Sequence, residues 1–434
     1  MRFPKLSLDK HFFAIAIAIV VFAFVTRVWR VANPPNFYFD EVYHAFTATT
    51  FLHNDPKGYE FWQTPPKGVA YEWTHPPLAK LMMAGGMVVF GENSFGWRIS
   101  SVLAGTGVVA ATGWLAHTLY KNKKLTLLAM ALVSFDGLLL TMSRIAMNDM
   151  HFVFFGLLSL VFYIRFKRTS SPKEAIFAAI MLGLSLASKW TALYIGAVIF
   201  VDYFFTLLFS KKIPFMSAAL ALLAGVVIIP SLYIASYSQF FLQGHTLKQW
   251  WDTTQQMWWY HTGLKATHTY QSKPWQWLLD LRPVWMYVDY SQNAKGMLAH
   301  IYNIGNPLLL WIGLSIAAVF GIQEGPAFLL RKTKKYEPET LFLLFLYLAL
   351  WLPWMFSPRI MFFYHYSPSI PILAILTAKA FLSIAKGSLV GKRLVCLLVF
   401  LIALIFLVLY PINTALPMPK GYFDTLFSIF PTWK

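Results

Sequence analysis

Two adjacent carboxylates, Asp40 and Glu41 in the run FYFDEVYH, are the strongest chemical feature of the sequence. Two acids held this close at a membrane surface repel each other and lose hydration, so we expect one of them to have a raised pKa and to be suited to proton transfer. An equally weighted alternative is that the pair complements the dipole at the N-terminus of a helix. Residues 41–53 do have the pattern of a short helix.

His75 stands before two prolines in EWTHPPLAKL. Proline is common in the first turn of a helix, so this segment predicts a bend that turns a surface helix beneath the acidic pair. For His75 itself, the alternative is a helix cap or a solvated loop residue.

Four further ionisable residues lie at or near the ends of long apolar runs: Arg98, Arg144, Asp149 and Lys189. Ionisable residues in or near membrane spans are costly, which makes them functional candidates by default. Two alternatives remain open. Arg144 and Asp149 would form an ion pair that joins two helix ends, or Lys189 would simply extend to the lipid headgroups.

A second basic group lies late in the chain, in SPRIMFFYHYSPSIP, which contains Arg359, His365 and Tyr366. Arginine and histidine at this position are able to hold a lipid phosphate. The alternative is a positively charged loop at headgroup level.

Segment 237–303 is rich in tryptophan and contains His245, His261 and His268, spaced by 16 and 7 residues. This spacing matches no common ligand pattern, so no metal site is expected. An interfacial aromatic belt and a substrate-binding role are about equally favoured for this segment.

Composition restricts the class of protein that carries these residues. Of 434 residues, 58% are hydrophobic and 12% are charged, and the mean hydropathy is +0.55. A soluble domain has roughly 25% charged residues, so an ordinary soluble enzyme, a disordered protein and a disulfide scaffold are excluded. The net charge of +18 does not indicate nucleic-acid binding here, because Lys and Arg collect in the cytoplasmic loops of membrane proteins.

Hydropathy predicts an all-α polytopic membrane protein that forms one domain over residues 1–434. Eleven candidate spans lie near 11–31, 98–120, 124–142, 149–166, 174–188, 190–209, 213–236, 304–322, 340–357, 368–386 and 392–411. A cleaved signal peptide is disfavoured for the first run, because the run is long and no small-residue cleavage site follows it.

Loop charge predicts the orientation of these spans. With the N-terminus in the cytoplasm, the cytoplasmic loops are short and basic, as the positive-inside rule requires: 121–124, 165–173, 211–212, 331–335 and 386–393. The outer segments are then 32–97, 143–148, 237–303, 357–367 and 412–434. Nearly every unusual polar residue falls on this outer face, which predicts an outer site supplied from the lipid.

Taken in order, these motifs resemble the protein O-mannosyltransferase family. The resemblance rests on the DE pair, HPPL, the arginine that opens the second span, SRIAMND, SKWTALY, the YH…H.Y.S.PWQW…RPVW block, GNP and FFYHYSPSIP, between about residues 12 and 411. It implies a GT-C glycosyltransferase fold with about eleven transmembrane helices and amphipathic surface helices in the outer loops. The long outer segment 237–303 is too short for a soluble MIR domain, so the chain resembles a compact prokaryotic member, with its site on the non-cytoplasmic face of the plasma (inner) membrane.

The resemblance also implies the reaction, an inverting transfer of mannose from polyprenyl-phosphate-mannose to Ser or Thr hydroxyls of exported proteins. A hydroxyl is a poor nucleophile, so a carboxylate must accept its proton; we expect Asp40 to be this base and Glu41 to orient a substrate. Cations would balance the departing phosphate in place of a metal or other cofactor. The expected donor-site residues are Arg98 first, then Arg144, Lys189, Arg359, His365 and Tyr366, with His75 and Asp149 around the sugar, and the residues of the acceptor or loop motif are His261, His268, Tyr270, Trp275 and Arg282.

Three other functions remain as alternatives. A related lipid-phosphate-sugar transferase would act on a lipid or glycan acceptor, and the H.Y.S.PW…RPVW block disfavours it. A transporter would place its charges in mid-membrane, whereas these charges cluster at the outer ends of the spans. A structural scaffold is disfavoured by the acidic pair and by the ordered polar loops. The expected partners are therefore the lipid-linked donor, exported or membrane acceptor polypeptides and membrane lipids, without nucleic acid.

Overall fold

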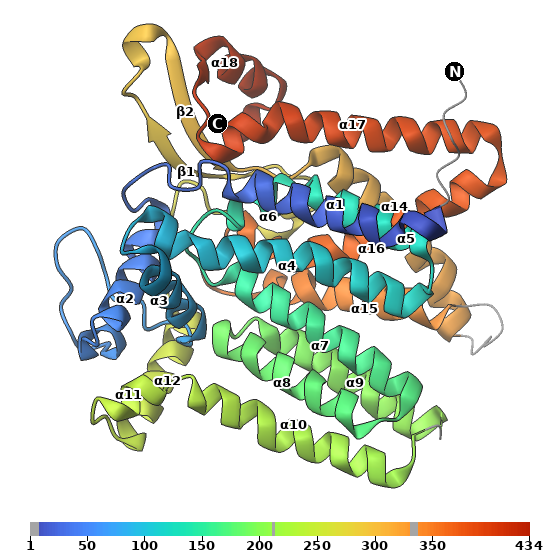
Figure 1. Ribbon diagram of the computed structural model, residues 1–434, viewed down its shortest axis with the longest axis horizontal. Coiled ribbons are helices and arrows are strands. Elements are labelled where there is room, and N and C mark those ends of the chain that lie inside the picture. The colour runs from blue at the N-terminus through green and yellow to red at the C-terminus, as the bar shows by residue number, and fades with distance from the viewer. Residues whose placement is uncertain (1–7, 211–212, 330–336) are drawn as a thin grey trace.

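Long apolar helices make up most of the chain in the computed structural model, which describes residues 8–210, 213–329 and 337–434 (Figure 1). Within these residues, nine helices are long and apolar enough to cross a membrane. They are α1 (Leu8–Val28), α4 (Ser94–Tyr120), α7 (Asp149–Thr169), α9 (Ala192–Ser210), α10 (Phe215–Ala235), α14 (Pro307–Leu329), α15 (Pro338–Trp351) with the 3₁₀ helix η4 (Leu352–Phe356), α16 (Ser369–Gly387) and α17 (Leu389–Thr414). The prediction of a polytopic helical membrane protein is confirmed.

Two of the eleven predicted spans fall short of this length. The run 124–142 is divided into α5 (Lys123–Ser134) and α6 (Gly137–Met142). The carboxylate of Asp136 accepts a hydrogen bond from the backbone N–H of Leu139 at 2.8 Å and caps α6, which starts a new helix inside the apolar run. The run 174–188 forms α8 (Pro172–Ser188), whose 17 residues extend over about 26 Å.

Short elements gather at one end of the long helices, the left end in Figure 1. Those labelled there are α2 (His44–Leu52), α3 (Leu78–Phe90), α11 (Ser238–Leu242) and α12 (Leu247–Gly263). The same outer segments also contain η1 (Phe39–Val42), η2 (Pro56–Tyr59) and α13 (Pro274–Trp277). The basic loops 121–124, 165–173 and 386–393 lie at the opposite end. The other two predicted basic loops, 211–212 and 331–335, lie outside the described residues.

α12 is one of the predicted amphipathic surface helices. Thr253 and Met257 are buried on one side of it, whereas Trp251 and Trp258 are exposed on another. Tryptophan on an exposed helix face is typical of a helix that lies in the membrane interface.

The start of α4 is fixed by a cap and by close packing. The side chain of Asn93 accepts hydrogen bonds from the backbone N–H groups of Phe95 and Gly96, each at 3.0 Å. α3 packs against this end of α4, and a Cβ atom on Gly86 would overlap the carbonyl oxygen of Gly96. Only glycine allows this approach, which holds the segment after His75 against the helix that carries Arg98.

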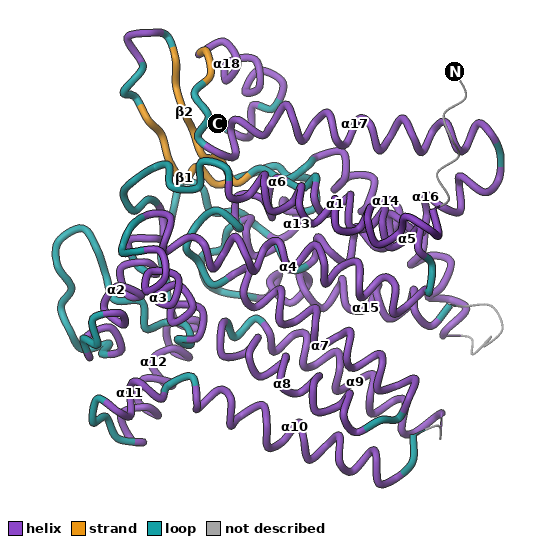
Figure 2. The backbone as a smooth tube through the Cα atoms, viewed as in Figure 1, coloured by secondary structure: helices purple, strands orange, loops and turns teal. Residues whose placement is uncertain are grey.

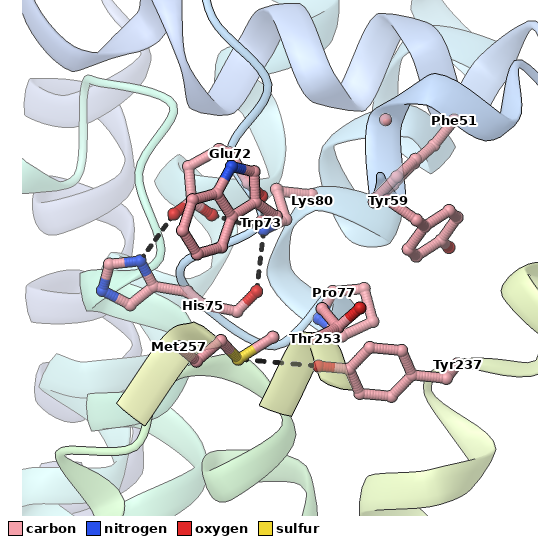
Figure 3. A pocket seen from close by; sticks show the side chains of 11 residues that line it. Phe51, Tyr59, Glu72, Trp73, His75, Pro77, Lys80, Tyr237, Thr253 and Met257 are labelled. Carbon is pink, nitrogen blue, oxygen red and sulfur yellow. Dashed lines mark hydrogen bonds and ion pairs between the residues drawn. The ribbon is translucent and has the colours of Figure 1, made fainter. Parts of the chain in front are cut away.

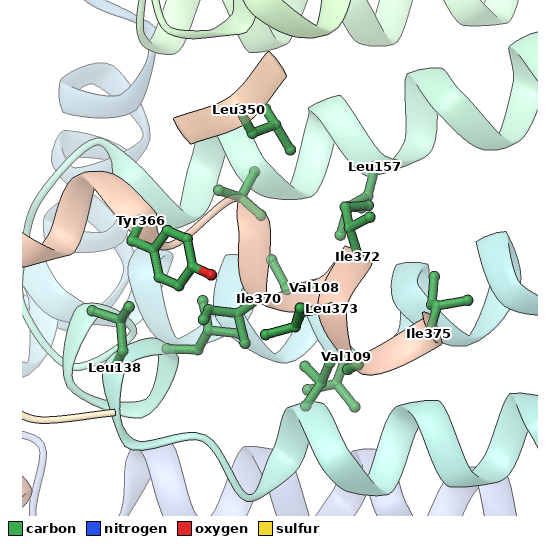
Figure 4. Close-up of a cluster of buried hydrophobic side chains, with 14 of the residues drawn as sticks. Val108, Val109, Leu138, Leu157, Leu350, Tyr366, Ile370, Ile372, Leu373 and Ile375 are labelled. Atoms are coloured by element: carbon green, nitrogen blue, oxygen red, sulfur yellow. The ribbon is translucent and has the colours of Figure 1, made fainter. Parts of the chain in front are cut away.

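α16 lies at the centre of the largest hydrophobic cluster (Figure 4). Its buried residues Ile370, Ile372 and Leu373 pack among Val108 of α4 and Leu157 of α7. The short segment that precedes α16 and carries the FFYHY motif is therefore anchored to the core.

A small antiparallel sheet was not predicted by the sequence analysis, which expected only helices in the outer segments (Figure 2). β1 (Val284–Asp289) pairs with β2 (Met297–Asn303), with an irregular register between Trp285 and Tyr287, and β2 pairs with β3 (Met418–Pro419). The 3₁₀ helix η3 (Asn293–Lys295) lies between the first two strands, and α18 (Lys420–Ile429) and η6 (Pro431–Trp433) follow β3. The aromatic and β-branched residues of VWMYVD favour a strand.

Candidate active site

A cavity of about 560 Å³ opens at the end of the bundle that carries the short elements. Four segments line it, 39–44, 70–75, 260–268 and 359–365, together with Met147 and Lys189. Four of the predicted outer segments, 32–97, 143–148, 237–303 and 357–367, thus meet around one cavity. The volume is within the range of small-ligand sites, roughly 300–1,000 Å³.

Asp40 lies on the cavity wall, in η1. Burial and the negative charge of Asp149 raise the pKa of Asp40 to about 7, against the opposing effect of Lys189. The hydroxyl of Tyr364 donates a hydrogen bond to the carboxylate. A carboxyl group with this pKa is partly ionised near neutral pH, and its ionised form is a stronger base than an ordinary aspartate, which suits it to act as a general base.

Glu41 points away from the cavity and is fully buried. Its carboxylate accepts hydrogen bonds from Nε and Nη2 of Arg98, both at 2.7 Å, and from the backbone N–H of Ala146 at 3.0 Å. It also accepts a hydrogen bond from the backbone N–H of Tyr38 at 3.3 Å. Glu41 therefore joins the acidic loop to α4 and to the segment before α7.

The two arginines expected first at the phosphate are not among the residues that line the cavity. Beyond its contact with Glu41, Arg98 donates to the carbonyl oxygens of Val31 at 2.8 Å and Pro34 at 2.7 Å. Arg144 donates to the carbonyl oxygens of Arg27 at 2.8 Å and Trp29 at 2.7 Å. Both guanidinium groups hold the chain that follows α1.

Lys189 and Asp149 form a buried ion pair, with 2.8 Å between Nζ and Oδ1. Lys189 lines the cavity, so the pair replaces both alternatives considered from the sequence, an Arg144–Asp149 pair and an exposed lysine. Asp149 begins α7 and Lys189 follows the last residue of α8, so the packing of these two helices positions the lysine.

Arg359 lines the cavity and makes no ion pair with a carboxylate of residues 8–210, 213–329 or 337–434. One of its N–H groups contacts Nδ1 of His261, and Nε2 of His261 lies 2.7 Å from the carbonyl oxygen of Thr74. His261 is therefore a donor at Nε2 and an acceptor at Nδ1, which fits a neutral ring. Burial and the charge of Arg359 lower the pKa of His261 to about 4.

His75 and Glu72 both line the cavity, and Lys80 is buried beside Glu72 outside the lining. The sequence analysis selected neither Glu72 nor Lys80. Nδ1 of His75 is 2.8 Å from Oε1 of Glu72, and Lys80 forms an ion pair with the same carboxylate. His44, also missed, lines the cavity with Nδ1 at 3.7 Å from Glu72. The available signal was the position of Glu72 three residues before His75 and eight before Lys80 in EWTHPPLAK.

His365 lines the cavity in the 3₁₀ helix η5 (Phe363–Tyr366), whereas Tyr366 lies in the core. The hydroxyl of Tyr366 is 2.6 Å from that of Tyr347. Trp277 stacks on His365 with 6.0 Å between the ring centroids. The PWQW motif thus supports His365 through a buried tryptophan, which sequence reasoning did not identify.

The residues of the acceptor or loop motif are separated by the structure. His268 lines the cavity, and Trp275 is exposed outside it. Arg282 lies over the ring of Tyr270 at 4.9 Å and donates to the carbonyl oxygen of Thr269 at 3.1 Å. Arg282 therefore holds the loop that carries His268.

In the described ranges, no three His, Cys, Asp or Glu side chains lie together in a way that could hold a metal ion. The positive groups on the cavity wall are instead protein side chains, Arg359 and Lys189.

Comparison with known proteins assigns the family. The model of the family described as dolichyl-phosphate-mannose-protein mannosyltransferase matches residues 17–247, and a model of the C-terminal four-helix membrane region of protein-O-mannosyltransferase matches residues 246–433. The polyprenol-phosphate-mannose–protein mannosyltransferase of Mycolicibacterium smegmatis is 25% identical, over 97% of this chain and 93% of that protein. The protein of the same name from Corynebacterium glutamicum is 25% identical, over 100% of this chain and 95% of that protein.

Solved structures show the same fold. The Saccharomyces cerevisiae protein O-mannosyltransferase Pmt1–Pmt2 complex bound to the sugar donor matches with a TM-score of 0.80 and 13% identity, over 99% of this chain and 93% of that chain. Apo ArnT from Cupriavidus metallidurans matches with a TM-score of 0.61 and 12% identity, over 94% and 77% of the two chains. The expected GT-C fold is confirmed, and the chain belongs to the dolichyl-phosphate-mannose-protein mannosyltransferase family.

Proposed function

We propose that this protein transfers mannose from polyprenyl-phosphate-mannose to Ser or Thr hydroxyls of exported polypeptides. The observation that carries the proposal is a cavity with a carboxylate of raised pKa, Asp40, and an arginine without a carboxylate partner in the described chain, Arg359. Membership of the mannosyltransferase family supports it. The names of the full-length relatives support this donor and a protein acceptor.

In the proposed reaction, the acceptor oxygen attacks C1 of mannose on the face opposite the phosphate, and the configuration inverts. Asp40 takes the hydroxyl proton as the new C–O bond forms. The bond between C1 and the phosphate oxygen breaks, and its electron pair leaves with polyprenyl phosphate. Asp40 then releases its proton to solvent.

Charge builds on the phosphate during this step, and fixed cations are the efficient way to stabilise it. We assign this role to Arg359, assisted by Lys189, because both line the cavity. Arg98 and Glu41 receive a structural role instead. Their buried contact fixes the backbone of η1, from which Asp40 reaches the cavity.

We further propose that the cavity opens to the non-cytoplasmic side of the plasma membrane. The described basic loops lie at the opposite end of the helices, and such loops are cytoplasmic in most membrane proteins. Cysteines introduced at exposed positions in 264–269 should react with an impermeant reagent added to intact cells, whereas cysteines in 121–124 should react only after permeabilisation. The reverse pattern would contradict this orientation.

The test of the function is mannose transfer in proteoliposomes. Purified protein receives polyprenyl-phosphate-mannose and a Ser/Thr peptide, and the products are identified by mass and anomeric configuration. Asp40→Asn should slow transfer roughly 10²–10⁴-fold, whereas Asp252→Asn should not slow it, because Asp252 lies on the surface in an ion pair with Lys248. Mannose found only on lipid would favour the related lipid-modifying transferase, and donor movement without cleavage would favour a transporter.

A further inference from the structure

A buried charged group adjoins His75: Glu72, which lines the cavity together with His75, and Lys80, which is not part of the cavity lining (Figure 3 shows the three side chains). Glu72 is 5% exposed and Lys80 is 1% exposed. Lys80 contacts the Glu72 carboxylate and donates a hydrogen bond to the backbone carbonyl of His75 at 3.0 Å. Nδ1 of His75 lies 2.8 Å from the other Glu72 oxygen, Oε1. One carboxylate therefore joins a buried lysine to a histidine that faces the cavity.

Local sequence explains why these three side chains meet. The two prolines after His75 end the extended segment, and α3 begins at Leu78, so Lys80 lies in the first turn of that helix. The bend brings Lys80 back toward Glu72. The backbone N–H of Glu72 donates to the hydroxyl of Thr47 in α2 at 2.7 Å, which fixes the other side of the group.

This arrangement determines which ring nitrogen of His75 carries a proton. Burial alone would raise the pKa of Glu72, but Lys80, His75 and His44 together hold it well below its usual range. An ionised Glu72 accepts a hydrogen bond, so Nδ1 of His75 is the donor. Burial, against the opposing charge of Glu72, keeps the pKa of His75 well below its usual range. The ring is therefore neutral and Nε2 carries a lone pair.

We propose that Glu72 and Lys80 are positioning residues that hold His75 with Nε2 toward the cavity, where it accepts a hydrogen bond from a hydroxyl group of the donor's mannose. The assignment rests on the proposed function. No hydrogen-bond partner for Nε2 is recorded in the described part of the chain, and His75 lines the cavity. In this proposal, Glu72 and Lys80 serve the recognition of the sugar through His75, in addition to stabilising the fold.

The sugar is the favoured partner among the groups that enter the cavity. A lone pair at Nε2 repels a phosphate oxygen, which Arg359 is better suited to hold. The acceptor hydroxyl gives its proton to Asp40 in the proposed reaction. A mannose hydroxyl still needs an acceptor when it leaves water, because a buried hydroxyl without one is costly.

The test is a double-mutant type of cycle, in which His75 is substituted in the protein and single hydroxyl groups are removed from the mannose of the donor. Donors that lack one hydroxyl at position 2, 3, 4 or 6 are compared with the mannosyl donor, on wild type and on His75→Phe. With wild type, one deoxy donor should lose roughly tenfold in kcat/KM and in donor affinity, the usual effect of one hydrogen bond. With His75→Phe, that deoxy donor and the mannosyl donor should perform equally.

Variants of the buried group distinguish positioning from stability. Glu72→Gln leaves Lys80 without its carboxylate, and we expect a higher donor KM with an unchanged peptide KM. Glu72→Gln combined with Lys80→Met removes both charges but keeps an amide oxygen for Nδ1, and should recover most of the donor affinity. Glu60→Gln is the matched control. It alters a similar carboxylate–histidine pair, 2.9 Å from His245, that is not part of the cavity lining.

Equal losses on wild type and His75→Phe for every deoxy donor would overturn the proposal, as would a change in peptide KM alone. Donor affinity is also measured without peptide, by tryptophan fluorescence of the reconstituted protein. These affinities complete the cycle and test the role of His75 even if no peptide accepts mannose. A failure of every peptide to accept mannose would count against the proposed function and not against this assignment.

Discussion

Acidifying the assay should stop mannose transfer through protonation of Asp40. The pKa of this carboxyl is raised to about 7, so about half of it is ionised at pH 7, about 10% at pH 6 and about 3% at pH 5.5. Only the ionised form accepts a proton, so kcat/KM should rise about tenfold per pH unit below pH 6 and level off above about pH 8. An ordinary aspartate, with a pKa near 3.9, would give a flat profile over this range.

Three histidines at or beside the cavity do not obscure this signal. Burial, reinforced by Lys189 and Arg359, lowers the pKa of His365 well below its usual range, and His261 has a pKa of about 4. Both histidines are neutral across the assay, as is His75. The donor is a phosphodiester and does not titrate there.

Removing either of two charges next to Asp40 should shift the inflection of the pH–rate profile, and the two shifts should be in opposite directions. Asp149 raises the pKa of Asp40 and Lys189 lowers it. Asp149→Asn should therefore move the inflection to lower pH, and Lys189→Met should move it to higher pH. If the pKa seen in the rate profile shifts in both directions as expected, the titrating group is Asp40, because the pKa of a distant group would not respond to either substitution.

The measurement is single-turnover transfer between pH 5.5 and 9 in proteoliposomes, with Asp252→Asn as the control. Asp40→Asn should lose roughly 10²–10⁴-fold in rate and lose the inflection. A wild-type profile that is flat down to pH 5.5 would refute the raised pKa. Asp40→Asn with near-normal rates would refute the role of base.

Three further predictions concern the remaining site residues. Glu41→Gln breaks the fully buried pair with Arg98, so thermal denaturation in detergent should show a loss of about 3–5 kcal/mol; unchanged stability would contradict the structural role. Arg359→Gln should fold normally and raise the donor KM at least tenfold, and an unchanged donor KM would move the phosphate elsewhere. Transfer should survive EDTA, because side chains supply the positive charge, whereas a loss that one divalent ion restores would show that a metal is required.

The apolar length of the runs in the sequence was enough to predict nine of the eleven expected spans as long helices of the described chain. The spans, the helix after the two prolines and the short helix near residues 41–53 follow from hydropathy and turn chemistry. The division of 124–142 was not predictable, because a single aspartate, Asp136, starts a new helix within an apolar run. The hairpin of β1 and β2 was missed because its aromatic residues equally suit a membrane interface.

The sequence located the segments of the site but not the direction of each side chain. Arg98 had the residue type and the position of a phosphate ligand, yet its partner Glu41 lies 57 residues earlier in the chain. Glu72 was not selected from the sequence, in which only its spacing from His75 and Lys80 distinguishes it from the solvated acids that are common in loops. Contacts between distant segments decide such assignments, and neither spacing nor composition records them.

The fixed geometry of η1 makes the order of the acidic pair matter as well as its presence. A 3₁₀ helix has three residues per turn, so neighbouring side chains diverge by about 120°, and here Asp40 faces the cavity while Glu41 faces Arg98. An ED sequence would have the same charge and composition. It would put the shorter acid against Arg98, about 1.5 Å short of its present reach, and the longer one into the cavity. The order of the two residues therefore determines which acid reaches the cavity and which reaches Arg98, and exchanging them would disturb both positions without changing the composition.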